Sequence, residues 1–176
     1  MTYVRPFRCD DLLKFNRINL DPLTETYGMN FYFQYLAHWP ELFQAAESPS
    51  GELMGYIMGK AEGRDELWHG HVTAVTVAPE YRRIGLAGAL MKNLEDVSEK
   101  KRCYFVDLFV RISNEVAVDM YHKLGYVIYR RVLDYYSGDN SDEDAFADMR
   151  KALSRDLNKK SVVPLKNPVR PEDVEF

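Results

Sequence analysis

The sequence predicts an α/β domain with a mixed sheet. Short β-branched or alternating segments recur along the chain, and amphipathic helical segments separate several of them. The 176 residues are enough for one domain with a full core, and they contain no internal repeats. The expected order of elements is β-α-α-β-β-β-α-β-α-β-β.

The first third of the chain contains local sequence signals for strands, helices and turns. Alternating residues indicate a strand, apolar residues three apart indicate a helix, and the turn sequence SPSG joins two further strands. In order, we expect a strand at 2–7, a helix that Asp10 caps, a connection at 19–28, a helix at 31–40, and strands at 42–47 and 52–62.

The middle of the chain carries the clearest patterns. A β-branched run predicts a strand, and leucines recur along one face of the helix that follows it. Asn114 is a plausible N-cap, and Gly125 is placed to end that helix in a left-handed conformation. We expect strands at 71–78, 104–111, 127–136 and 145–153, a helix at 85–100, a helix after Asn114, and an acidic loop at 138–144.

The end of the chain differs from the rest. Residues 155–176 show no periodicity, and prolines recur among them. We therefore predict a domain at 1–154 and an extended tail at 155–176 without a core of its own.

Composition excludes several functional classes. The net charge of −4 argues against broad binding to nucleic acids or anionic membranes. The longest uncharged stretch, residues 26–40, is shorter than the roughly 20 residues of a membrane helix. Cys9 and Cys103 form no C-x-x-C motif, and the N-terminus does not resemble a signal peptide. We expect a cytoplasmic protein with free thiols.

The stretch VAPEYRRIGLAGALM, residues 77–91, predicts an anion site where a strand passes into a helix. A Walker A loop fails at Gly59-Lys60, because Ala61 stands where a hydroxyl is needed. A dinucleotide fingerprint fails because Ala87 and Leu90 replace glycines. What remains is R-x-x-G-x-A, which is weak by itself. A solvated turn that happens to carry arginines is the alternative.

Two motifs together resemble the GCN5-related N-acetyltransferase family of acetyl-CoA-dependent enzymes. VAPEYRRIGLA, from Val77, matches the family's first motif, and NEVAVDMYHKLGY, from Asn114, matches its second. The number of residues between the two motifs also matches the separation found in this family. The resemblance implies a single domain whose mixed, mostly antiparallel sheet is flanked by helices, and it implies that the anion is the pyrophosphate of coenzyme A. The cofactor contacts that it implies are Val75, Val77, Arg82, Arg83, Ile84, Gly85, Leu86, Ala87, Gly88, Asn114 and Tyr121.

The resemblance extends over nearly the whole chain to the NatB-type family of N-terminal acetyltransferase catalytic subunits. It rests on NLDPLTETYG, FYFQYLAHWP, HGHVTAVTVAPEYRR, FVDLFVR, DYYSG and PVRPEDVE. It implies acetylation of nascent proteins that start Met-Asp, Met-Glu, Met-Asn or Met-Gln. It also implies a large helical-repeat auxiliary subunit that brings the enzyme to ribosomes. The aromatic helix at 31–40 is expected to leave an apolar patch for this partner, unless it is deeply buried.

The same resemblance gives roles to individual side chains. It places the Tyr121 hydroxyl where it can protonate the departing thiolate. Strand alternation puts His71 and Thr73 on the face of Val75 and Val77. The resemblance implies that both contact the substrate; without it, His71 would more simply be a hydrogen-bonded histidine of the strand. The remaining expected substrate contacts are Glu25 and Tyr27 in the first connection, and Tyr135 and Tyr136 before the acidic loop. Glu25 and His71 are also candidate proton acceptors.

Three alternatives remain open at this stage. His69 and His71 share a strand face, but no third metal ligand is evident in the sequence, so we expect no metal. A member of the same superfamily that acetylates lysines or small amines is the nearest rival. The third alternative is a non-catalytic subunit that binds acyl-CoA.

Overall fold

The computed structural model describes residues 3–20, 24–133, 145–170 and 174. Its elements follow the predicted order closely, with short 3₁₀ turns between them. The helices are α1 (Asn16–Asn19), α2 (Met29–His38), α3 (Leu86–Lys100) and α4 (Glu115–Lys123). The strands are β1 (Tyr3–Pro6), β2 (Phe43–Glu47), β3 (Leu53–Glu62), β4 (His69–Val77), β5 (Phe105–Arg111), β6 (Val127–Val132) and β7 (Phe146–Ala152).

The seven strands belong to one sheet, in the order β1-β2-β3-β4-β5-β7-β6. The pairs β1–β2, β2–β3, β5–β7 and β6–β7 are all antiparallel. The predicted α/β class with a mostly antiparallel sheet is therefore confirmed. The chain forms two compact units, Met1–Lys60 with Val72–Val97 and Ala61–His71 with Ser98–Phe176, and each is described by itself.

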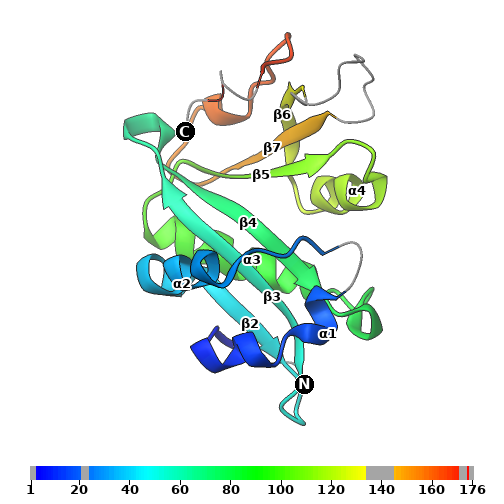
Figure 1. Cartoon of the computed structure of the whole chain (residues 1–176). Helices are drawn as coiled ribbons and strands as arrows, with labels where there is room; N and C mark the ends of the chain where they lie inside the picture. Colours follow the sequence, from blue (N-terminus) through cyan, green and yellow to red (C-terminus); the bar gives the residue numbers. More distant parts are fainter. Residues whose placement is uncertain (1–2, 21–23, 134–144, 171–173, 175–176) are drawn as a thin grey trace. The chain divides into compact units, whose positions relative to one another are not determined.

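The first unit is built around an aromatic core. Figure 1 shows α2 and α3 on opposite faces of β2 to β4. On the α2 side, Phe7 stacks on Phe43 with ring centroids 4.2 Å apart, and Tyr56 is completely buried beside them. Burial of such rings is a large favourable contribution to folding.

The predicted first helix is wrong in its length and its cap. The segment instead forms a 3₁₀ turn at Cys9–Leu13 and the single-turn α1. Asp11, not Asp10, accepts the backbone N–H of Arg8, at 2.8 Å, and it also receives two hydrogen bonds from the Arg5 guanidinium, at 2.7 and 2.9 Å. This buried ion pair joins β1 to the turn that follows it, and the apolar spacing of the sequence gave no sign of it.

The aromatic helix α2 buries Tyr32 and Tyr35 and leaves Met29 and Phe33 exposed, so only part of its apolar surface is available to a partner. Tyr32 and Tyr35 are in the core, and Phe31, Leu36 and Trp39 pack against it in part. The exposed apolar side chains of this region are Leu13, Leu20, Met29 and Phe33.

The second unit contains β5, β6, β7 and α4. Asn114 Oδ1 accepts the N–H of Ala117 at 3.3 Å, and Gly125 has a φ of +93° just beyond α4. The predicted cap and left-handed termination of this helix are therefore confirmed. Tyr126 follows the glycine and is buried.

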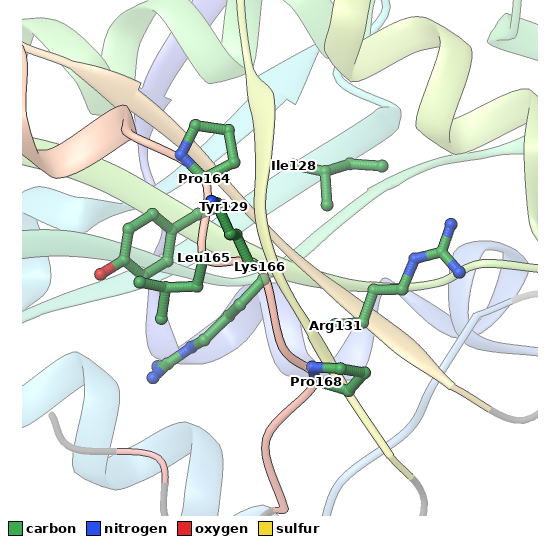
Figure 2. A pocket seen from close by; sticks show the side chains of 8 residues that line it. Ile128, Tyr129, Arg131, Pro164, Leu165, Lys166 and Pro168 are labelled. Atoms are coloured by element: carbon green, nitrogen blue, oxygen red, sulfur yellow. The ribbon is translucent and has the colours of Figure 1, made fainter.

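The described part of the tail runs along strand β6. Leu165 N donates to Tyr129 O at 2.7 Å, and Val169 N donates to Arg131 O at 2.9 Å. Figure 2 shows the pocket between them, which measures about 150 Å³. The tail thus pairs with a strand edge that would otherwise expose unpaired backbone groups. The division of the chain at residue 154 stays a prediction.

Two further findings concern the thiols and the helices. Cys9 and Cys103 are both free, and burial raises the pKa of the Cys103 thiol to about 11. Within the part of the chain that the structure describes, no helix has both the length and the apolar character needed to cross a membrane.

Candidate active site

The turn between β4 and α3 has the backbone geometry of an anion site. Arg83 and Gly85 have φ angles of +64° and +83°, so the chain reverses direction sharply before the helix. Ala89 N donates to Gly85 O at 3.1 Å, which makes Gly85 the first acceptor of α3. The N–H groups of residues 86–88 therefore have no acceptor within the helix and are available to an anion.

The side chains around this turn differ in exposure. Arg83, Ile84 and Gly85 are exposed, Leu86 is buried, and Ala87 and Gly88 are half-buried. Arg82 is anchored instead, because its Nε donates to Val77 O at 3.0 Å. On β4, Val75 is half-buried and Val77 is buried.

The first connection is held against β4 by hydroxyl groups. Thr24 Oγ1 lies 2.8 Å from Thr76 Oγ1, and Thr73 Oγ1 lies 2.8 Å from the Tyr35 hydroxyl. Thr73 was predicted from the sequence, but Tyr35 and Thr76 were not, because each of these hydrogen bonds joins residues that are far apart in the chain. The strand face that carries Thr73 therefore has a fixed neighbour in α2.

Glu25 and Tyr27 lie on the connection that Thr24 attaches. Glu25 is exposed, whereas Tyr27 stacks on Phe31 with centroids 4.5 Å apart. Burial, followed by the charge of Glu25, raises the pKa of Tyr27 to about 12. Tyr27 is therefore a neutral hydrogen-bonding phenol at physiological pH.

In the second unit, His71 is paired with a carboxylate that the sequence analysis missed. His71 Nδ1 lies 2.7 Å from Asp107 Oδ1, and the Asp107 side chain is almost fully buried. Asp107 sits in the middle of β5, where sequence spacing gives no sign of a partner on β4. A buried aspartate within an apolar strand was the only available signal.

Tyr121 is a buried tyrosine on α4. Its ring meets that of Tyr126 edge-on, with centroids 6.0 Å apart. Burial raises the pKa of Tyr121 to about 12, so the phenol keeps its proton at physiological pH. Such a group can donate a proton to a stronger base. Asn114 caps the same helix, and Tyr135 and Tyr136 lie outside the described residues.

One cluster of possible metal ligands is present among the described residues. Glu62, His69 and His71 offer ligand atoms that all lie within 4.8 Å of one another. The expectation that the two histidines lack a third neighbour is therefore wrong, because Glu62 of β3 supplies it. His71 Nδ1 is already engaged by Asp107.

The turn, the strand and the capped α4 all fall within one family match. Residues 12–126 match the model of the acetyltransferase (GNAT) family. The chain belongs to the acetyltransferase (GNAT) family. The predicted family is thus confirmed, and with it the predicted class of enzyme.

Relatives within this family are similar over the whole chain. The Arabidopsis thaliana N-terminal acetyltransferase B complex catalytic subunit NAA20 is 62% identical over 177 residues, covering 100% of this chain and 99% of that protein. Chaetomium thermophilum Naa20 with a bisubstrate analogue has a TM-score of 0.86 and 45% identity, covering 97% of each chain. A NatB acetyltransferase complex bound to CoA and MES has a TM-score of 0.77 and 46% identity, covering 86% of this chain and 99% of that one.

Proposed function

We propose that this chain is the catalytic subunit of a NatB-type N-terminal acetyltransferase. It transfers acetyl from acetyl-CoA to the α-amine of proteins that start Met-Asp, Met-Glu, Met-Asn or Met-Gln. The observation that carries the proposal is the end-to-end similarity to plant NAA20 at 62% identity. The CoA and the bisubstrate analogue in similar structures support acetyl-CoA as cosubstrate.

In this proposal the pyrophosphate of coenzyme A binds at the turn that opens α3. The N–H groups of residues 86–88 and the positive end of a 15-residue helix favour a diphosphate there. Arg83 is exposed and can add a charge, while Arg82 stabilises the turn through Val77 O. Strand β4 presents backbone at Val75 and Val77 to the pantetheine arm, and Asn114 and Tyr121 complete the proposed cofactor contacts.

The acceptor amine needs little chemical activation. A peptide α-amine has a reference pKa near 7.7–8.0, so roughly an eighth to a quarter of it is already neutral near pH 7.2. A lysine amine, with a reference pKa near 10.4, needs a much stronger base. Positioning of the thioester and the amine therefore supplies most of the rate.

Two side chains have proposed roles in proton transfer. His71 accepts a proton from the ammonium form of the peptide, or Glu25 relays it. Once the amine has attacked the thioester carbonyl, the C–S bond breaks and Tyr121 donates its proton to the thiolate. The tyrosinate regains a proton as the attacking nitrogen loses one to become the amide. Tyr121 is protonated at neutral pH, as a proton donor must be, and the burial that raises its pKa makes it a weaker acid than an exposed tyrosine.

Peptide selection falls to the polar groups around β4 and the first connection. Thr73 and Tyr121 can donate hydrogen bonds to an acidic or amide second residue, and His71 can do so from Nε2 once its ring has taken up a proton. Glu25 is exposed for the free amine, and Tyr27 keeps a neutral hydroxyl. Tyr135 and Tyr136 are proposed to bind the peptide backbone.

An auxiliary subunit is proposed to cover part of the first unit. Leu13 and Leu20 are 79% and 81% exposed, and Met29 and Phe33 are also exposed. Leaving these side chains in water is unfavourable, so a partner of complementary apolar surface is favoured. We infer that the partner brings the enzyme to ribosomes and nascent chains in the cytoplasm.

The decisive test is the choice of acceptor. The full chain, alone and with its auxiliary subunit, is given acetyl-CoA and peptides that start Met-Asp, Met-Lys or Ser-Ala, together with a peptide with a blocked N-terminus and an internal lysine. We expect Met-Asp to have by far the highest kcat/KM. Equal rates on the three free N-termini would overturn the proposed specificity, and preference for the lysine peptide would overturn the proposed function.

A further inference from the structure

Asp107 is hydrogen-bonded to His71 and lies close to His69, both on the strand β4. Its Oδ1 lies 2.7 Å from His71 Nδ1, and its Oδ2 lies 3.5 Å from His69 Nε2. Arg150 stands directly opposite on β7. The residue is 1% exposed, so this carboxylate has almost no contact with water. Its orientation is therefore set by these neighbours.

The charge state of Asp107 determines where the proton of His71 sits. Burial acts to raise the pKa of Asp107, but the hydrogen bond from His71 and the positive charge of Arg150 are among the effects that hold it below its ordinary value. An ionised carboxylate only accepts hydrogen bonds. His71 Nδ1 must then carry the hydrogen, and Nε2 of the neutral ring carries the lone pair.

His69 is the second histidine beside Asp107, but its Nε2 makes no hydrogen bond in the structure. Its Nδ1 lies 2.6 Å from the carbonyl oxygen of Leu67, which can only accept, so this nitrogen also carries a hydrogen. Its ring stacks on Phe105, with centroids 4.7 Å apart and an interplanar angle of 3°. The His69 ring is therefore locked in place, and its Nε2 edge faces Asp107.

We propose that Asp107 is a positioning residue for acetyl transfer, which holds His71 in the tautomer whose Nε2 can accept a proton from the peptide ammonium group. This inference rests on the proposed function, because it takes His71 as the side chain that meets the amine. In the step, an ammonium N–H bond breaks and an Nε2–H bond forms. The positive charge that develops on the imidazole is balanced by the Asp107 carboxylate.

A metal ion is the competing use of this cluster, since Glu62, His69 and His71 lie within reach of one ion. The shortest contact nevertheless joins His71 and Asp107 directly at hydrogen-bond distance. This bond engages only Nδ1 of His71, so an ion in the cluster would have to be held through Nε2. The hydrogen bond is present in the structure as it stands, and metal content is one outcome of the test.

The test uses Asp107→Asn, which keeps the side-chain shape but removes the charge. In the full chain with its auxiliary subunit, we expect kcat for a Met-Asp peptide to fall at least about tenfold, with KM for acetyl-CoA unchanged. Asp119→Asn, an exposed residue on α4, is the matched control and should retain full activity. Asp107→Asn should cause no further loss when combined with His71→Ala, because it acts through that ring.

A spectroscopic readout separates positioning from a merely structural role. Long-range proton–nitrogen NMR spectra of the wild-type chain should show His71 protonated at Nδ1, and Asp107→Asn should shift it toward a mixture of tautomers. Should the variant fail to fold, the wild-type spectrum still decides, because protonation at Nε2 would overturn the proposal. Additive losses in the double variant, or activity that depends on a bound metal, would also overturn it.

Failure of the proposed function is distinguishable from failure of this inference. A wild-type enzyme that acetylates no N-terminal peptide contradicts the function, while the tautomer spectrum still tests Asp107. An active wild type together with an equally active Asp107→Asn contradicts this inference alone.

Discussion

Thr73 Oγ1 and the Tyr35 hydroxyl lie 2.8 Å apart, so a side chain of the proposed substrate face is hydrogen-bonded to the core of the first unit. Tyr35 is 5% exposed, and its ring packs between those of Phe31 and Trp39, at 5.0 and 5.2 Å. The helix that carries these aromatic residues thus holds a position on β4. This connects the packing of α2 to the chemistry proposed for the strand.

The two partners of this hydrogen bond can be separated by mutation. Thr73→Val and Tyr35→Phe each remove the bond, and each should lower the free energy of unfolding by about 1 kcal/mol. Only Thr73→Val removes the hydroxyl that is proposed to contact the peptide, so only it should raise KM for a Met-Asp peptide. Chemical denaturation and steady-state kinetics check both claims. An equal rise of KM in Tyr35→Phe would contradict the direct contact.

The structure shows where sequence reasoning succeeds and where it stops. Local signals were sufficient for α3, for the capped α4 and for the β2–β3 hairpin, because each depends on residues close in sequence. The first helix was mispredicted because the buried pair of Arg5 and Asp11 overrides the three-residue spacing. A propensity of a few tenths of a kcal/mol per residue cannot compete with such a pair.

The site was predictable in its motifs but not in its supporting contacts. Gly85 and Tyr121 belong to linear patterns, so the sequence alone was enough to propose them as site residues. Asp107 and Tyr35 act through residues on other strands or helices, and no spacing rule links residues 36 or 38 positions apart. These partners depend on strand order, which the sequence leaves open.

Tyr121→Phe tests the proposed acid. The phenyl ring keeps the edge-on contact with Tyr126, so the fold should be preserved. We expect kcat to fall by about 100-fold, within the usual range for general acid catalysis, while KM for acetyl-CoA changes by less than about twofold. Tyr126→Phe is the matched control, and it should keep wild-type kcat. Unchanged turnover in Tyr121→Phe would remove this residue from the mechanism.

The pH dependence of the wild-type enzyme gives a second test of Tyr121. Burial raises its pKa to about 12, and the proton-donating form is the one present below the pKa. The acid form is therefore retained as pH rises through 10, the ordinary value for a tyrosine. We therefore expect kcat of the wild-type enzyme not to fall near pH 10. A fall near pH 10 that is present in the wild type and absent in Tyr121→Phe would contradict this expectation. Such a loss would show that the hydroxyl is not shielded.

Gly85→Ala tests the turn that is proposed to bind the pyrophosphate, and Gly51→Ala is its matched control. Both glycines have φ near +85°, and a Cβ at either position meets no atom within 4 Å. The cost of each substitution is therefore conformational, about 1 kcal/mol, and not steric. Both variants should lose similar stability in thermal unfolding, but only Gly85→Ala should weaken acetyl-CoA binding, by severalfold in calorimetry. Equal affinities in the two variants would place the pyrophosphate elsewhere.

Substitution of two exposed apolar side chains of the first unit, Leu20 and Phe33, tests the proposed partner surface. Leu20 and Phe33 are 81% and 43% exposed, so Leu20→Asp with Phe33→Asp should leave the fold of the isolated chain intact. Burying two charges in an apolar interface is costly, and co-purification with the auxiliary subunit should be lost. Leu157→Asp, at an 88% exposed position in the second unit, is the control and should retain the partner. If the double variant still binds while Leu157→Asp does not, the partner contacts the second unit instead.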